Sequence, residues 1–245
     1  MLFVDFAFLT HSGLLRKYNQ DNLVCLKEYL PEKHNDMTEP VTSSAIVPPY
    51  ALFGVFDGMG GEEYGEAASY IAAKEASSES IVDLAGLEAL CRRANDKICE
   101  YVKKNRIRSS GTTAAMLLFD RQGVNCCHIG DSRIYRYSNG KLDQLTKDDV
   151  FPSFSGKKAP LLQCLGIPED EMQIRPHLDY YPIHSEATFI VCTDGLSDMM
   201  TNEQMIVILS GNGSLQQQAK KLLTQSLKAG GRDNITLFLI RAYEL

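Results

Sequence analysis

The sequence lacks the features of secreted, membrane-spanning and nucleic-acid-binding proteins. No apolar run approaches the roughly twenty residues that cross a bilayer, and the first residues, MLFVDFAFLTHSG, have no basic segment before their apolar part. Basic residues are not in excess, since 25 Lys and Arg stand against 31 Asp and Glu, for a formal net charge of −6. This balance argues against a protein that binds nucleic acid by counterion release. We therefore expect a cytoplasmic protein that binds neither nucleic acids nor membranes.

Cysteine pairs and histidine clusters of the kind that bind zinc are also missing from the sequence. The seven cysteines include no C-x-x-C pair and mostly lie in apolar runs, so we expect reduced core thiols rather than disulfides or zinc ligands. The histidines are scattered along the chain, and each is expected to be a surface or core residue rather than a metal ligand. They are His11, His34, His128, His177 and His184.

Hydrophobic periodicity predicts strands and helices in the first part of the chain. Apolar runs at 3–10 and 22–26 are expected to pair as a hairpin across the polar turn SGLLRKYNQD. The segment 27–49 carries four prolines and many polar residues, so it is expected to be a loop. Next come a predicted strand at 50–56, helices at 62–76 and 84–105, and an antiparallel meander of strands at 112–119, 123–129, 133–137 and 141–145.

The last third of the chain returns to helices after a stretch, 147–182, that is poorly periodic apart from an apolar turn at 161–165. The final helix is expected to begin with a capping box, Ser214 with Gln217, and to stop at Gly230–Gly231. The predicted elements are a strand at 188–192, helices at 202–209 and 214–228, and a strand at 235–243.

Length and element order together predict the fold class. A chain of 245 residues with 44% hydrophobic content can form a single domain, 1–245, with one large core. Runs of strands interrupted by pairs of helices indicate an α+β layered architecture rather than alternating βαβ units. Two antiparallel sheets with helices outside are expected.

Three aspartates stand where an apolar, strand-like run meets a glycine or an asparagine: Asp57 in ALFGVFDGMGG, Asp194 in FIVCTDGLSD and Asp233 in GRDNITLFLI. Asp-Gly is typical of hairpin turns, but Asp57 and Asp194 are each followed by a predicted helix rather than a second strand. A carboxylate at the end of a buried strand is costly unless a positive group meets it. Hard cations such as Mg²⁺ and Mn²⁺ prefer oxygen ligands. The pattern therefore predicts a site for a hard divalent cation.

Seven short motifs follow one another along nearly the whole chain. They are RKYNQDN at 16–22, VFDGMGG at 55–61, SGTTA at 110–114, IGDSRIYRY at 129–137, GKLDQLTKDD at 140–149, CTDGLSD at 192–198 and GRDNIT at 231–236. In this order they resemble the metal-dependent protein phosphatases, the serine/threonine phosphatases of type 2C, in their compact bacterial form. The resemblance implies a four-layer α-β-β-α sandwich with two metal ions, Mn²⁺ or Mg²⁺, held at one end between the sheets.

The resemblance implies metal-binding roles for several residues. Asp57 matches the carboxylate that bridges the two ions, and Gly58 matches the neighbouring backbone carbonyl ligand. Asp194 and Asp233 match the carboxylates of the second ion. Asp131, in GDSR, matches a ligand of a weaker third ion, which Asp198 is expected to join.

Two further residues match the family's substrate machinery. Asp21 matches an acidic residue that orients metal-bound water, and Arg16 matches the guanidinium that grips the substrate phosphate, for which a planar fork of donors is suited. The implied reaction is hydrolysis of phosphoserine and phosphothreonine by a water or hydroxide that bridges the two ions, without a phospho-enzyme. Met59 stands where many eukaryotic relatives have a histidine proton donor, so water is expected to protonate the leaving oxygen.

A cysteine-dependent phosphatase and a binding module without turnover fit the sequence less well. Cys127 to Arg133 fits the C-x5-R pattern of cysteine-dependent phosphatases, but a strand-like sequence follows Arg133, and Asp131 would place a negative charge inside the phosphate cradle. A binding module without turnover would lack ligand carboxylates, yet all of the matched ones are present. The expected partners are phosphorylated proteins, among them a serine/threonine kinase and its substrates, and the chain is expected to be a monomer. A phosphatase that serves a specialised signalling switch stays open as an alternative to a general partner of a serine/threonine kinase. Asp149 replaces the histidine that often closes the LT-x-D-H motif, and the flap region 147–182 has its own sequence, so the substrate preference stays open as well.

Overall fold

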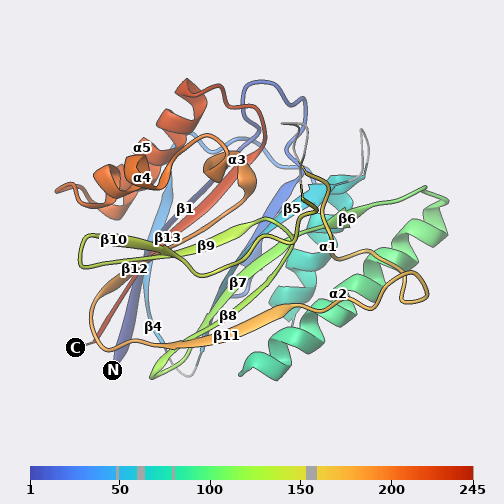
Figure 1. The fold of residues 1–245 in the computed structure, drawn as a ribbon, viewed down its shortest axis with the longest axis horizontal. Helices are drawn as coiled ribbons and strands as arrows, with labels where there is room; N and C mark the ends of the chain where they lie inside the picture. The colour runs from blue at the N-terminus through green and yellow to red at the C-terminus, as the bar shows by residue number, and fades with distance from the viewer. Residues whose placement is uncertain (48–49, 60–63, 79–80, 153–158, 245) are drawn as a thin grey trace.

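The computed structural model describes residues 1–47, 50–59, 64–78, 81–152 and 159–244. Two antiparallel β-sheets pack face to face, and helices cover the outer face of each sheet (Figure 1). This is the predicted α+β arrangement of two sheets between helical layers. Among the described residues, no helix combines the length and the apolar character needed to cross a membrane.

The first sheet has the strand order β10-β9-β12-β13-β1-β4. Its long strands β1 and β13 pair along their whole length, from Leu2 opposite Glu244 to His11 opposite Ile235. The strands are β1 (Leu2–His11), β4 (Val41–Ile46), β9 (Arg133–Ser138), β10 (Lys141–Gln144), β12 (Ala187–Cys192) and β13 (Ile235–Glu244).

The second sheet has the order β11-β8-β7-β5-β2-β3, and the short strand β6 pairs separately with β5. Its strands are β2 (Asp21–Cys25), β3 (Glu28–Tyr29), β5 (Ala51–Met59), β6 (Gly111–Thr112), β7 (Ala114–Phe119), β8 (Gly123–Ile129) and β11 (His177–Pro182). The helices are α1 (Gly65–Ser78) and α2 (Leu84–Asn105) on this sheet, and α3 (Asp194–Ser197), α4 (Asn202–Leu209) and α5 (Leu215–Lys228) on the first sheet.

Three apolar layers hold the sandwich together, one between the sheets and one beneath each group of helices. The central layer contains a chain of touching aromatic rings, with centroid separations from 5.0 to 5.9 Å and mostly edge-on or tilted geometry, which is the favoured arrangement for such rings. The rings belong to Phe6, Phe53, Phe119, Phe189 and Phe238. Because these rings come from both sheets, they fix how the two sheets face each other.

The predicted hairpin at the start of the chain is wrong. β1 lies in the first sheet and β2 in the second, so the connection between them crosses from one layer to the other. The predicted meander is wrong for the same reason, because β7 and β8 pair in the second sheet whereas β9 and β10 pair in the first. Both crossings run past the end of the sandwich where the predicted metal ligands lie.

Edge strands were missed in the two segments expected to be irregular. Within 27–49, β4 pairs with β1 and β3 pairs with β2; within 147–182, β11 pairs with β8. Almost every residue of β4 is exposed, so its sequence VTSSAI shows no apolar alternation. Residues 48–49 and 153–158 of these segments lie outside the described residues.

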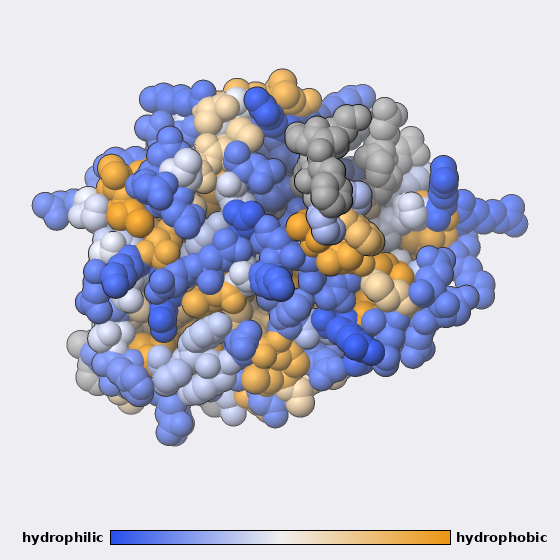
Figure 2. Space-filling model, viewed as in Figure 1, coloured by the Kyte–Doolittle hydropathy of each residue, from blue (hydrophilic) through white to orange (hydrophobic). Residues whose placement is uncertain are grey.

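Elements with strong helical periodicity were predicted closely. α2 and α4 have the predicted bounds, and α5 begins with the predicted capping box: Gln217 N–H donates to Ser214 Oγ at 3.2 Å, and Ser214 N–H donates to Gln217 Oε1 at 3.0 Å. Figure 2 shows hydrophilic and hydrophobic residues interspersed over the face turned to the viewer.

Candidate metal centre

Three carboxylates from distant parts of the sequence meet at one end of the sandwich. Asp57 is in β5, Asp131 is in the turn between β8 and β9, and Asp194 begins α3 directly after β12. One candidate ligand oxygen from each lies within 4.8 Å of the other two, and Asp131 and Asp194 are buried. Asp57 thus comes from the second sheet, Asp194 from the end of a strand of the first sheet, and Asp131 from the connection between the two sheets.

The chemistry of this group fits a hard divalent cation. Negative charges this close in a poorly hydrated place repel one another strongly, and a cation between them removes that cost. A set of carboxylate oxygens is the donor set of Mg²⁺ or Mn²⁺ rather than of softer metals. Asp131, which the sequence placed at a peripheral third ion, lies with Asp57 and Asp194 in the same group.

Hydroxyl groups position the backbone at Asp57. Thr113 Oγ1 accepts a hydrogen bond from Asp57 N–H at 3.0 Å and lies 2.6 Å from Ser132 Oγ, next to Asp131. Thr112 Oγ1 and Thr113 N–H both donate to the Asp57 carbonyl, each at 2.9 Å. The SGTTA and GDSR motifs are therefore joined at the site. Periodicity gave no sign of these roles, and the only signal was the presence of the motifs.

Neither Asp-Gly pair forms a hairpin turn. Asp57 and Gly58 lie within β5, and Asp194 and Gly195 begin α3. A Cβ added at Gly58 would come 2.2 Å from the Gly65 carbonyl oxygen, and one added at Gly195 would come 2.0 Å from the Asn234 carbonyl oxygen. At both positions a neighbouring backbone segment lies so close that only glycine, which has no Cβ, fits after the aspartate. Gly60 and Gly61, the remaining glycines of that motif, lie outside the described residues.

Asp21 is buried beside the group and is held by two hydroxyls. Its Oδ2 accepts hydrogen bonds from Thr193 Oγ1 at 2.9 Å and from Thr236 Oγ1 at 2.7 Å. In the pairing of β2 with β5 it lies directly opposite Asp57. Thr193 immediately precedes Asp194, so Asp21 connects the strand of one sheet to the helix start above the other.

Asp233 is engaged by Arg16. Arg16 Nη2 lies 2.7 Å from Asp233 Oδ2, and the two side chains are 51% and 27% exposed. Among the described residues, Asp233 is not one of the three carboxylates that lie within 4.8 Å of one another. The structure thus brings the predicted phosphate-binding arginine onto one of the predicted metal ligands.

Asn234, which sequence reasoning missed, anchors the loop that carries Arg16. Its Oδ1 accepts from Gln20 N–H at 2.8 Å, and its Nδ2 donates to the carbonyls of Ser12 at 2.9 Å and Tyr18 at 3.0 Å. The loop between β1 and β2 is therefore fastened to the residue that follows Asp233.

Asp198 lies at the end of α3 and is exposed. Its N–H donates to the Asp194 carbonyl at 2.7 Å, and its side chain is outside the group formed by Asp57, Asp131 and Asp194 among the described residues. The structure places it next to the site without bringing its carboxylate into it.

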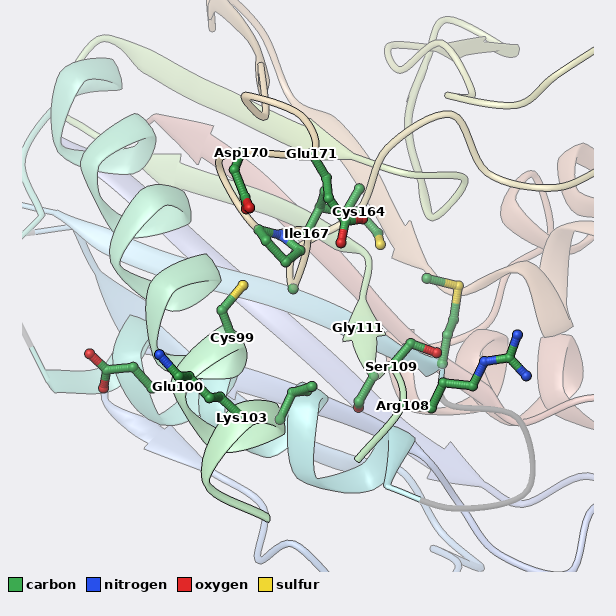
Figure 3. A pocket seen from close by; sticks show the side chains of 15 residues that line it. Cys99, Glu100, Lys103, Arg108, Ser109, Gly111, Cys164, Ile167, Asp170 and Glu171 are labelled. Atoms are coloured by element: carbon green, nitrogen blue, oxygen red, sulfur yellow. The ribbon is translucent and has the colours of Figure 1, made fainter. Parts of the chain in front are cut away.

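A pocket of about 800 Å³ begins at Met59 and runs along the second sheet's helical side. Figure 3 shows Cys99, Glu100 and Lys103 of α2 on one side, with Cys164 and Ile167 across from them. Arg108 lies at the end opposite Glu100 (Figure 3). The pocket carries charges of both signs, and Met59 connects it to the carboxylate group through Gly58.

The cysteine-dependent alternative does not fit the structure. Cys127 is fully buried, and its hydrogen bond to Cys91, with Sγ atoms 3.6 Å apart, together with burial raises its pKa well above the ordinary value. Arg133 begins β9 and binds Asp148 through Nε and Nη2, the latter at 2.7 Å. The thiol is therefore protonated and far from an open phosphate cradle.

The sequence matches known proteins over most of its length. Residues 42–230 match the family model described as Protein phosphatase 2C. The chain is 30% identical over 203 residues to the serine/threonine protein phosphatase PstP of Mycobacterium tuberculosis, which covers 76% of this chain but 39% of that protein. It is 26% identical over 257 residues to the serine/threonine phosphatase stp of Listeria monocytogenes, covering 95% of this chain and 94% of that protein.

Solved structures have the same fold. The catalytic domain of the serine threonine protein phosphatase PstP, in complex with two manganese ions, superposes with a TM-score of 0.79 at 25% identity over the full length of both chains. The Streptococcus agalactiae serine/threonine phosphatase superposes with a TM-score of 0.79 at 22% identity, covering 97% of this chain and 98% of the other.

Proposed function

Because the chain belongs to the protein phosphatase 2C family, we propose that it is a metal-dependent protein serine/threonine phosphatase with one catalytic domain spanning residues 1–245. The observation that carries this proposal is the meeting of Asp57, Asp131 and Asp194 within 4.8 Å at the end of the sandwich. The family match also confirms the resemblance inferred from the ordered motifs.

The residues that would hold the cations are Asp57, Asp131 and Asp194, together with Asp233 and the Gly58 carbonyl. The two manganese ions in the PstP structure favour two ions here, Mn²⁺ or Mg²⁺, with Asp131 and Asp198 available to a weaker third. Ions held there would activate a water for attack on phosphorus and would neutralise charge on the phosphoryl oxygens, so that hydrolysis would need no phospho-enzyme.

Arg16 is proposed to bind the substrate phosphate. A guanidinium has five N–H donors in a planar fork, and the bond from Nη2 to Asp233 uses one of them. With half of its side chain exposed, Arg16 can present the others to two phosphate oxygens without leaving Asp233. A phosphate bound by Arg16 in this position would lie beside Asp233.

Asp21 is proposed to orient the attacking water from behind the carboxylate group. Thr193 and Thr236 fix its Oδ2, and its place opposite Asp57 aims the carboxyl at the same region. A buried carboxylate fixed by two hydroxyls keeps one orientation, which is what a positioning group requires.

The pocket beside Met59 is proposed to receive peptide residues next to the phosphorylated side chain. It opens from the residue that follows Gly58, and it carries Lys103 and Arg108 as well as Asp170 and Glu171. The substrates are proposed to be phosphorylated proteins, with a serine/threonine kinase among the partners. Because Met59 cannot donate a proton, water is proposed to protonate the leaving oxygen.

The experiment is phosphate release from a phosphothreonine peptide, measured with added Mn²⁺ and with a chelator. The Asp57→Asn variant should lower kcat/KM by about 100-fold or more, because several kcal/mol of charge stabilisation depends on metal binding. Asp179→Asn, which changes an exposed aspartate on β11, is the matched control and should keep full activity.

Two outcomes would reject this function. Activity that persists unchanged in the chelator would exclude a metal-dependent reaction. Activity that survives in Asp57→Asn but disappears in Cys127→Ser would restore the cysteine-dependent alternative.

A further inference from the structure

Two histidines and an aspartate that are far apart in the sequence meet beside the second sheet's edge. His128 of β8 and His177 of β11 are directly opposite in the strand register, and their rings stack with centroids 4.5 Å apart. His177 Nε2 lies 2.8 Å from Asp149 Oδ1. One candidate ligand atom from each of the three residues lies within 4.8 Å of the other two. Scattered along the chain, these histidines form a cluster in the fold.

The outer contacts of the cluster are those of metal ligands. His128 Nε2 lies 2.9 Å from the Lys147 carbonyl, which can only accept, and 3.3 Å from the Lys147 N–H. With its proton on Nε2 donated to that carbonyl, the ring would keep a lone pair on Nδ1 for a metal ion. Asp149 Oδ2 accepts hydrogen bonds from Gly130 N–H and Gln163 Nε2, both at 3.0 Å. Metal-bound histidines and carboxylates are oriented in this way by backbone carbonyls and amide donors.

We propose that His128, Asp149 and His177 bind one Zn²⁺ ion at a site distinct from the carboxylate centre formed by Asp57, Asp131 and Asp194. Two imidazole nitrogens with one carboxylate oxygen are a donor set suited to zinc, with a fourth position left to water. Bonds near 2.1 Å in a tetrahedral site would set the ligand atoms roughly 3.4 Å apart. The 2.8 Å between His177 Nε2 and Asp149 Oδ1 would lengthen slightly to admit the ion, and the other separations are already within 4.8 Å. The ion would take the place of the proton in the bond between His177 and Asp149.

The position of the cluster gives zinc a structural consequence. His177 is 40% exposed and offers an entry route, whereas Asp149 is nearly buried. Asp149 N–H also donates to the Gly130 carbonyl at 3.0 Å, and Gly130 precedes Asp131 of the carboxylate centre. Bound zinc would therefore fasten β8, β11 and the segment after β10 to the turn that carries Asp131.

The test is a calorimetric titration of the whole protein with Zn²⁺ in excess Mg²⁺, which occupies oxygen sites but does not compete for imidazole. A parallel titration with Co²⁺, followed by visible absorption, reports nitrogen ligation without any assay of activity. The variants are His177→Ala and Asp149→Asn; the latter keeps the size and hydrogen-bonding shape of the side chain. His184→Ala removes an exposed histidine just beyond β11 and is the matched control.

One Zn²⁺ per protein is expected for the natural sequence and for His184→Ala, with affinity reduced by roughly 100-fold or more in His177→Ala and Asp149→Asn. Absence of stoichiometric zinc binding, or equal binding by all four proteins, would overturn the proposal. Binding that is lost in Asp57→Asn but kept in His177→Ala would assign the zinc to the carboxylate centre and overturn it as well.

Discussion

At the scale of single residues, the Asp21 carboxylate and the Asp57 backbone are held by hydroxyl groups that each serve more than one partner. Thr236 Oγ1 donates to Asp21 and lies 2.7 Å from Thr10 Oγ1, while Thr113 Oγ1 joins the Asp57 backbone to Ser132. Such shared hydrogen bonds fix a polar site more firmly than separate pairs do. The site is therefore preorganised by side chains that do not themselves carry charge.

Replacing Arg16 should weaken substrate binding. In Arg16→Ala, loss of charge-assisted hydrogen bonds worth about 1.5–3 kcal/mol should raise KM for a phosphothreonine peptide by roughly 10- to 100-fold. Arg16→Lys should recover part of the loss, because lysine keeps the charge but not the planar fork. Steady-state kinetics with the neighbouring exposed Lys17→Ala as control would decide the matter. Identical KM and kcat for Arg16→Ala and the natural sequence would remove Arg16 from the phosphate site.

A methyl group at Gly195 should disturb the start of α3. Its Cβ would lie 2.0 Å from the Asn234 carbonyl oxygen, so the backbone beside Asp194 or Asp233 must move. Gly195→Ala should cost about 1–3 kcal/mol of unfolding free energy and reduce Mn²⁺ affinity. In Gly213→Ala the new Cβ meets only ordinary contacts of 3.4 Å or more, so this variant serves as the control. Equal denaturation midpoints for the two variants would contradict the predicted clash.

Apolar runs that end at an aspartate selected Asp57, Asp194 and Asp233 from the sequence, because a carboxylate there needs a positive partner. The structure brings Asp57 and Asp194 together. The grouping of Asp131 with them, and the contact between Arg16 and Asp233, could not be predicted in this way. These depend on how two sheets face each other, and a one-dimensional pattern contains no such distance.

At the scale of elements, α1 and α2 are joined by one buried carboxylate. Glu75 of α1 is 5% exposed and binds Arg93 Nε at 3.0 Å and Lys97 Nζ, both on α2. Burial pushes the pKa of Glu75 upward, but the hydrogen bonds from Lys97 and Arg93 outweigh it and hold the pKa below the ordinary value of 4.5. The ion pairs thus stabilise the helix pair only while Glu75 is charged.

This arrangement predicts a pH-dependent loss of stability in Glu75→Gln. Since the folded-state pKa is lowered, the stabilisation is complete above pH 4.5 and disappears as the pH falls through the lowered pKa. Near pH 7, Glu75→Gln should unfold with about 1–3 kcal/mol less free energy, and the difference should shrink below pH 4.5. Urea denaturation at several pH values measures it. A difference that stays constant with pH would show that packing, not charge, is responsible.

The control for Glu75→Gln is an exposed ion pair within α2. Glu88 and Arg92 pair at 2.6 Å on α2 with both side chains about two-fifths exposed. Pairs of this kind contribute little, so Glu88→Gln should change stability by less than about 0.5 kcal/mol.

Element prediction worked where periodicity was strong and failed where it was weak. The helices α2 and α5 have an apolar stripe against a sheet; α2 has the predicted bounds, and α5 begins one residue after the predicted start. β4 and β11 are edge strands with mostly polar or exposed residues, so their pairing comes from neighbours rather than from their own pattern. Hydrophobic periodicity predicts which residues are buried, so a strand whose residues are mostly exposed gives no such signal.

At the scale of the whole molecule, cation binding and folding should be coupled. The carboxylate centre joins parts of both sheets and exists only in the folded state, so Mn²⁺ should stabilise that state by mass action. At a hundred times the dissociation constant, the gain of about 2.7 kcal/mol should raise Tm by roughly 5–10 °C.

Thermal denaturation with and without Mn²⁺ measures this coupling. Asp57→Asn should lose most of the shift, whereas the control Asp179→Asn should keep it. A shift of equal size in Asp57→Asn would show that manganese acts elsewhere on the protein.

The layered architecture was predicted from the sequence, but the routes between layers were not. Apolar alternation shows that a strand has a buried face without saying which of two sheets it joins. The crossings from β1 to β2 and from β8 to β9 are therefore visible only in the structure. The first crossing places Arg16 beside Asp233, and the second places Asp131 beside Asp57 and Asp194.

The pairing of β1 with β13 constrains how the protein is made. Thr10 and Thr236 share a hydrogen bond although they are 226 positions apart, and β13 also separates β1 from β12 in the sheet. During synthesis, β1 has no partner in β13 until residues 235–244 have emerged from the ribosome. Contacts this distant in sequence form slowly. The nascent chain therefore lacks its complete first sheet for the whole time that residues 12–234 are being made.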